Sequence, residues 1–293
     1  MRKPLLYILV VVCGWLGVLA LNLLLSNGES LLLQHLERSS GRKISAREVR
    51  MTFVPAIGLH LKEFSMADDP AFSSRAFLTA KDVRVSFKVL PLFLYQLRLK
   101  EVIVYDAVSN IIRDSAGIYN FSSLGVEGTK KRSLERSGRS EPPTRRYSAA
   151  LIPSSLIQII NGTIRYLDQT NGSDMTVNQL DLKAVDLDDE NSFKVELAMA
   201  VFAAEQNLQL RAAVGPLAAQ KSFRDLPLDG ELRFDRFDMA KLRTALPTIK
   251  EGLPKVLDLR GIYTTQGVRF KGTFNRPSLQ GQVEGTDASF RLE

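Results

Sequence analysis

The strongest constraint on this chain is an apolar run from Pro4 to Leu25 that contains no charged side chain. A helix rises about 1.5 Å per residue, so this run would extend roughly 33 Å. That length is close to the roughly 30 Å hydrocarbon core of a bilayer. Arg2 and Lys3 directly precede the run, which favours a cytoplasmic N-terminus and an exported body. The sequence therefore predicts a single-pass membrane anchor within residues 1–28.

A cleaved signal peptide is the alternative interpretation of this segment. Val18-Leu19-Ala20 resembles a weak cleavage site. The apolar core of a signal peptide usually has about 7–15 residues, however. Here the apolar run continues through Leu21–Leu25. The length of the run favours an anchor that stays attached to the chain.

The net charge of +7 is concentrated in two segments of the chain. Arg2 and Lys3 contribute +2, and residues 125–150 hold seven basic and three acidic residues, a net charge of +4. Because the remainder is nearly neutral, we expect no nucleic-acid partner. Residues 125–150 lack apolar periodicity and are predicted to form a flexible linker. This linker would contact anionic headgroups of the adjacent membrane, or it would be a solvated loop without a partner.

Metal and catalytic chemistry have no support in the sequence. The single cysteine, Cys13, lies in the apolar run, and the two histidines are His35 and His60. No His or Cys cluster has the spacing of zinc ligands, and no hydrolase, metalloprotease, dinucleotide or phosphate-loop motif is present. The acidic pair Asp68-Asp69 is expected to be a solvated turn rather than a Ca²⁺ site. We therefore predict no catalytic, cofactor-binding or metal-binding residue and no enzyme activity.

Two stretches alternate apolar and polar residues most clearly, which is typical of strands with one buried and one wet face. The apolar positions in these stretches are Val83, Val85, Phe87 and Val89, and Phe193, Val195, Leu197 and Met199.

Rougher alternation occurs elsewhere. It places Leu99, Ile103 and Tyr105 on one face of a strand. It also places Ile160, Ile164 and Tyr166 on one face around the turn pair Asn161-Gly162. Short helices are predicted at 29–38 and 238–246.

The predicted fold is mainly β: about a dozen strands in a twisted, mostly antiparallel β-groove or sandwich with few short helices. Four segments follow from the pattern: an anchor at 1–28, a first β region at 29–124, a basic linker at 125–150, and a second β region at 151–293 that continues the sheet. The last residues lie in a strand-like run, and we expect the chain to be shorter than its relatives or part of a longer polypeptide.

Several sequence pieces between Gly41 and Leu124 carry a family resemblance: GRKI, FVPAIGLHLKEFSM, FLTAKDVRVSFKVLPLF and IIRDSAGIYNFSSL. This region resembles the N-terminal part of the AsmA family of bacterial envelope proteins. The matching positions of the last piece are Arg113, Asp114, Gly117, Asn120 and Phe121. Phe121 replaces the usual Trp of the family. The later piece SSLIQIINGTIRYLDQ is also similar to the family and ends in Tyr166 and Asp168.

The resemblance implies a bacterial inner-membrane anchor with a periplasmic β-rich body, in which the motif residues are architectural. It also implies a relation to bridge-like lipid-transfer proteins, with a chorein-like N-terminal region and a role in moving phospholipid or in outer-membrane assembly. The apolar strand faces would then contact phospholipid acyl chains. Ordinary sandwich core is the alternative for the same residues. A scaffold that assists other envelope proteins is the alternative function, and an anchored enzyme is a third.

Overall fold

A computed structural model describes residues 33–34, 37–38, 40–52, 57–88, 99–124, 156–187, 191–216, 225–245, 258–273 and 275–291. The predicted anchor at Pro4–Leu25, the predicted linker at 125–150 and Val89 lie outside these residues. Within the described ranges, no helix is both long enough and apolar enough to cross a membrane.

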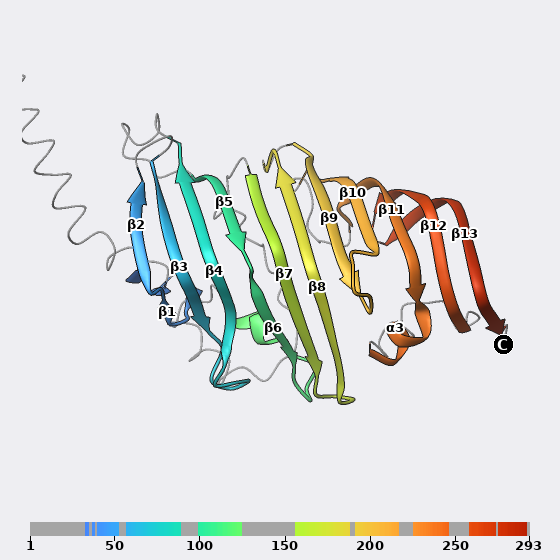
Figure 1. The fold of residues 1–293 in the computed structure, drawn as a ribbon, viewed down its shortest axis with the longest axis horizontal. Helices are drawn as coiled ribbons and strands as arrows, with labels where there is room; N and C mark the ends of the chain where they lie inside the picture. The colour runs from blue at the N-terminus through green and yellow to red at the C-terminus, as the bar shows by residue number, and fades with distance from the viewer. Residues whose placement is uncertain are drawn as a thin grey trace, which may run out of the picture.

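The described strands all join one 13-stranded sheet, and none forms a second sheet facing it as in a sandwich (Figure 1). The strands are β1 Ile44–Ser45, β2 Glu48–Thr52, β3 Gly58–Ala67, β4 Ala76–Phe87, β5 Leu99–Tyr105, β6 Val108–Arg113, β7 Leu156–Asp168, β8 Ser173–Val185, β9 Phe193–Val201, β10 Leu208–Val214, β11 Pro227–Asp238, β12 Asp258–Thr273 and β13 Arg276–Arg291. Among the described residues, two short helical elements have defined bounds, η1 at Asn120–Ser123 and α3 at Met239–Ala245. Residues 33–34, 37–38 and 40, which overlap the helix predicted at 29–38, are also helical.

The strand order is β1-β3-β4-β5-β7-β8-β9-β10-β11-β12-β13, with β2 beside β3, and β6 paired with β4 and β7. From β7 to β13 each strand pairs with the next in antiparallel fashion, as predicted. The exception to the antiparallel pattern is β7, which runs parallel to both β5 and β6. The sheet is therefore mixed.

Left-handed backbone positions occur in or beside several strands of the sheet, although β4 has none. Glu63 in β3, Asp106 between β5 and β6, Asn161 in β7 and Gln179 in β8 have φ values of 50°, 50°, 56° and 50°. A residue in this conformation interrupts the pleat, so the alternation of side chains between the two faces shifts by one position. In β3, the apolar positions Leu59 and Leu61 precede Glu63 and the apolar Phe64 follows it in the same core cluster.

One of these shifts corrects a prediction for β7. Ile160 and Ile164 lie on opposite faces: Ile160 pairs with Tyr105, whereas Ile164 packs with Val177 in the second core cluster. The left-handed Asn161 between them is the physical reason.

In β5, Val102 and Val104 pair with Val85 and Val83 on the apolar face. Ile103 and Tyr105 therefore point to the other face. Leu99 returns to the face of Phe87 because the register shifts between Ser86 and Phe87. The predicted common face of Leu99, Ile103 and Tyr105 is therefore wrong.

The helix predicted near residue 238 is α3, and it shows that the sheet curls. The Asp238 carboxylate accepts a 3.0 Å hydrogen bond from the Lys241 backbone N–H, which caps the helix. α3, which follows β11 in Figure 1, contacts both β8 and β12. Its Leu242 packs against the cluster of Val177 and Phe237. In a flat sheet, four steps of about 4.8 Å would separate β8 from β12 by roughly 19 Å, which exceeds a helix diameter of about 10–12 Å. The apolar face is therefore concave here.

Candidate functional site

A continuous row of apolar residues crosses nine neighbouring strands, from β3 to β12. Each member is the register partner of the next, and register partners point to the same face of a sheet. We name this set the central apolar row: Leu61, Val83, Val104, Ile159, Leu182, Leu197, Leu210, Leu232 and Val268.

A second row runs beside it on the same face, two residues away along each strand. It carries small side chains in its middle part, at Ala184, Ala212 and Gly230. Its members are Leu59, Val85, Val102, Ile157, Ala184, Val195, Ala212, Gly230, Phe270 and Leu279. The two rows together define an extended apolar surface that we call the trough.

The opposite face is polar at the neighbouring register positions. With one exception, Ile103, its row consists of charged and amide side chains: Arg84, Ile103, Gln158, Lys183, Glu196, Arg211, Glu231, Arg269 and Gln280. Along these rows the sheet is thus amphipathic from β4 to β13, with an apolar face and a mainly polar face.

Burial along the central apolar row changes from one end to the other. Leu61 and Val83 are buried beneath a core cluster that includes Leu33 from the N-terminal helical residues. From Val104 to Val268, the row members are only half-buried. In the part of the chain that the structure describes, the trough beyond β4 is therefore open to solvent along most of its length, apart from the end where α3 packs.

The residues predicted to line a lipid groove lie on this face where the structure describes them. Val83, Val85, Val195 and Leu197 belong to the two rows. The predicted Phe87 packs in the core cluster with Val83. The other two predicted residues, Phe193 and Met199, lie on the same face of β9 as Val195 and Leu197, and they pair with Val214 and Leu208 of β10. Sequence alternation missed other members of the rows, such as Ile159, Leu182 and Val268. Only the interstrand register, which is not local information, brings these residues into line.

A buried polar cluster ties the start of β1 to the η1 turn. The Asn120 side chain is fully buried, and its Nδ2 donates hydrogen bonds to Asp68 (2.8 Å) and to the Asn110 carbonyl (2.9 Å). Its Oδ1 accepts from the Ile112 backbone N–H at 3.1 Å. The Arg42 guanidinium donates to the Asn120 carbonyl at 2.7 Å and forms an ion pair with Asp68 at 3.5 Å.

Asp68 is therefore part of the core, and the expectation of a solvated turn at this position is wrong. Its side chain is only 1% exposed. Burial raises the pKa of the Asp68 carboxyl, and the hydrogen bond from Asn120 partly offsets this effect.

A second polar cluster closes the ends of β6 and β7 around Asp168. Arg113 forms a 3.1 Å ion pair with the Asp168 carboxylate, and the Tyr166 hydroxyl donates to the same oxygen at 3.1 Å. Burial opposes ionisation of Asp168, but hydrogen bonds from Thr170, Arg113 and Tyr166 outweigh it and hold its pKa below the usual range. Burial also raises the pKa of the Tyr166 phenol.

The other family-motif positions form the turn beside these clusters. The Gly117 backbone N–H donates to the Asp114 carbonyl at 2.9 Å, and Gly117 has φ of 80°, which explains why a glycine suits this place. Phe121 is 41% exposed and stacks on Tyr119. The motif residues therefore serve the turn and its polar clusters, and all lie away from the central apolar row.

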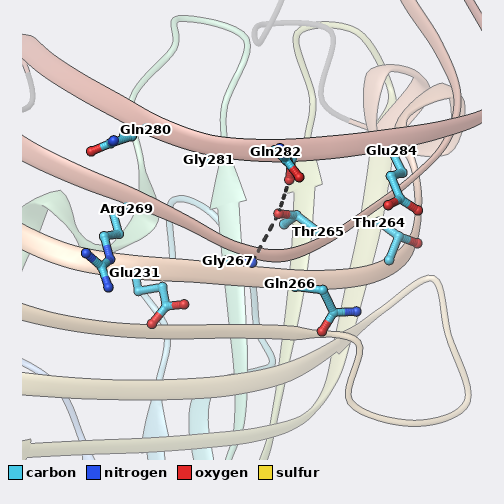
Figure 2. Close-up of a pocket in the computed structure, with 10 residues that line it drawn as sticks. All are labelled: Glu231, Thr264, Thr265, Gln266, Gly267, Arg269, Gln280, Gly281, Gln282 and Glu284. Carbon is cyan, nitrogen blue, oxygen red and sulfur yellow. Dashed lines mark hydrogen bonds between the residues drawn. The ribbon is translucent and has the colours of Figure 1, made fainter.

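A separate hollow of about 450 Å³ lies among β11, β12 and β13 (Figure 2). Glu231, Arg269 and Gln280 of the polar row line it, so it belongs to the wet face and not to the trough. Its backbone is held by Thr265, whose Oγ1 donates to the Gln282 carbonyl at 2.6 Å. Sequence patterns contain no signal for this hollow, because a bulge between Thr264 and Gly267 creates it.

No group of His, Cys, Asp or Glu in the described ranges could hold a metal ion. The two buried polar clusters join strands through hydrogen bonds to charged groups. The feature that remains for binding is the extended apolar surface of the trough.

The sequence model of the AsmA family matches residues 5–243. No curated protein matches the chain. The matched range includes most of the predicted anchor, both polar clusters, the strands from β1 to β11 and the first five residues of α3. This chain belongs to the AsmA family.

Proposed function

We propose that this protein is a single-pass inner-membrane protein with a periplasmic body that contributes to phospholipid transport between inner and outer membranes, or to outer-membrane homeostasis. The observation that carries the proposal is the central apolar row, which continues without a polar residue from Leu61 to Val268. An apolar surface of this extent needs a partner, and acyl chains are a partner of matching chemistry.

Contact with acyl chains accounts for binding without a specific pocket. Each buried CH₂ contributes about 0.8 kcal/mol, and successive strands offer nearly equivalent side chains such as Leu182, Leu197 and Leu210. A lipid could therefore move from strand to strand without leaving a deep energy minimum, while its headgroup stays in water. This role is non-catalytic and requires no cofactor.

The length of the trough limits what one chain could do alone. Eight interstrand steps of about 4.8 Å between β3 and β12 give roughly 38 Å. A whole bilayer with headgroups is about 40–45 Å thick. Transfer to a second membrane would therefore need further copies, other envelope proteins or additional sheet.

The proposal is tested by measuring phospholipid that co-purifies with the full chain in mild detergent, using lipid extraction and mass spectrometry. Two adjacent residues of β10 provide a matched pair. Leu210 belongs to the central apolar row, and Gln209 is exposed on the polar face. Leu210→Glu places a charge in the trough and should reduce bound phospholipid by at least about fivefold, because acyl chains do not solvate a carboxylate. Gln209→Glu adds the same charge on the polar face and should leave the amount of bound phospholipid unchanged.

Absence of phospholipid from the unmodified chain would argue against the proposal. Equal lipid content in both variants would argue against the trough as the binding surface. Circular dichroism of each variant shows whether the sheet is retained, so that a loss of lipid can be separated from a loss of fold.

A second candidate function is a scaffold for outer-membrane protein or envelope assembly, and β13 favours it. β13 is the last strand of the sheet and pairs only with β12 in the described part of the chain. Its residues from Arg276 to Asp287 are exposed, including Val283 at 49%. An open edge presents unpaired backbone groups to which another chain can add a strand. A photo-crosslinker at Val283 should then capture envelope proteins, and the same group at Gln209 should not.

A further inference from the structure

Two large apolar side chains are exposed together in the turn that follows β6. Ile118 is 51% exposed and Phe121 is 41% exposed. The Phe121 ring stacks on Tyr119 with a centroid distance of 5.0 Å. Arg113 is the register partner of both Tyr119 and Asp168. Leu167 directly precedes Asp168 in β7, so it lies at the same end of the sheet, and it is 38% exposed.

The turn backbone is fixed although its apolar side chains face solvent. The Ile118 backbone N–H donates to the Asp114 carboxylate at 2.8 Å, and the Asp114 N–H donates to the Ile118 carbonyl at 2.9 Å. Between the two exposed residues, Asn120 is completely buried. Exposure of Ile118 and Phe121 is thus built into a rigid turn, and such exposure commonly marks an interaction surface.

The turn is attached directly to the chain segment that follows the predicted anchor. Arg42 donates hydrogen bonds to the Asn120 carbonyl at 2.7 Å and to the Ser123 hydroxyl at 2.8 Å. Leu33 already packs on the core. Only residues 26–32 separate Leu33 from the end of the apolar run, and seven residues reach at most about 25 Å. The body, and with it this turn, is therefore tethered close to the bilayer surface.

The chemistry of the turn and of the chain after it matches a lipid interface. Aromatic and aliphatic side chains such as Tyr119, Phe121 and Ile118 are favoured at the boundary between headgroups and acyl chains. The chain continues from Leu124 into residues 125–150, whose net charge is +4. Basic residues beside a bilayer are attracted to anionic headgroups.

We propose that the turn Ile118–Phe121 is a membrane-contact foot that inserts its apolar side chains into the interface of the bilayer crossed by the anchor. Its partner is a phospholipid surface with anionic headgroups. The foot would hold the first strands of the sheet, and hence the beginning of the trough, at a fixed height above the membrane. This inference rests on the anchor but does not require lipid in the trough.

Tryptophan fluorescence tests the foot in the full chain, because Trp15 is the only tryptophan. In a Trp15→Phe background, Phe121→Trp is placed in proteoliposomes of phosphatidylglycerol and phosphatidylethanolamine, with or without acyl chains brominated near the headgroup. Bromine quenches tryptophan at short range. We expect at least about a twofold loss of emission for an interfacial residue. The matched control is Val283→Trp, an exposed apolar position on β13, whose emission should not change.

Equal emission of Phe121→Trp with and without bromine would overturn the proposal, as would failure of the chain to insert into the vesicles. Quenching at both positions would show non-specific adsorption and would also overturn it. A second variant, Ile118→Glu in the Phe121→Trp chain, should at least halve the quenching because it charges the foot. Replacement of Leu210 by Glu in the trough should leave the quenching unchanged, which separates the foot from the proposed lipid transport.

Discussion

The side-chain amide of Asn120 donates a 2.8 Å hydrogen bond to the carboxylate of Asp68, 52 residues away in sequence. This contact joins the end of β3 to the turn after β6. With Arg42 attached to both residues, it also fixes the point where the chain enters the sheet. A buried amide with this many partners is costly to leave unsatisfied, so the cluster specifies one arrangement of the first strands.

Asn120→Ala is expected to destabilise the protein by about 2–4 kcal/mol, because it leaves the Asp68 carboxylate and the Ile112 N–H without these bonds. Equilibrium urea unfolding of the full chain in mild detergent, followed by circular dichroism, measures this change. Gln209→Ala on the exposed face of β10 is the control and should stay within about 0.5 kcal/mol of the unmodified chain. A midpoint for Asn120→Ala equal to that of the control would contradict a structural role for this cluster.

Sequence alternation predicts the face of each residue well where neither a left-handed residue nor an extra residue, such as Lys100 in β5, interrupts the strand. The stretches Val83–Phe87 and Phe193–Met199 are free of such residues, and their apolar positions face the trough. In β7, Asn161 shifts the alternation, so local pattern places Ile160 and Ile164 together when they lie apart.

Long-range pairing accounts for the other features that sequence could not predict. The local sequence around Asp68 predicts a solvated turn. Its burial depends on contacts with Arg42 and Asn120, which are distant in sequence. The trough likewise depends on interstrand register, in which Val104 meets Ile159 across a parallel pair that no local pattern indicates.

The Asp168 carboxylate should make stability depend on pH in the acid range. Its pKa in the folded protein is below the ordinary value of 3.8, so the stabilisation is present above about pH 4 and is lost as the pH falls through the lower folded value. Asp168→Asn should therefore destabilise the protein at pH 7, by about 1–3 kcal/mol for bonds to a charged group. The difference from the unmodified chain should shrink toward pH 3.

Urea unfolding at pH 7, 5, 4 and 3 checks this dependence. Asp174→Asn, at an exposed position of β8, is the matched control and should show a small difference at every pH. A constant difference between Asp168→Asn and the unmodified chain over this range would argue against an ionised, hydrogen-bonded Asp168.

The cap of α3 gives a separate prediction for the curled part of the sheet. Asp238→Ala removes the acceptor for the Lys241 N–H and should cost about 1 kcal/mol, whereas Asp238→Asn keeps an acceptor and should cost only a few tenths. Thermal unfolding of both variants provides the comparison. Equal losses would indicate that the charge of Asp238 matters more than the cap.

Two glycines of the curled strands should respond differently to the same substitution. A Cβ at Gly230 would lie 2.3 Å from the Arg211 carbonyl oxygen, a backbone atom that cannot move without disturbing the β10–β11 ladder. A Cβ at Gly267 would meet the Glu231 carboxylate at 2.1 Å, which is the end of a flexible side chain.

Gly230→Ala should therefore cost about 1–3 kcal/mol through overpacking, whereas Gly267→Ala should cost clearly less because Glu231 can rotate away. Urea unfolding of the two variants under one set of conditions decides the order. Gly230 also lies in the second apolar row, so Gly230→Ala should narrow the trough. Reduced co-purifying phospholipid in a folded Gly230→Ala protein would locate bound acyl chains at β11. A larger loss of stability for Gly267→Ala would contradict the close approach of β10 and β11 at Gly230.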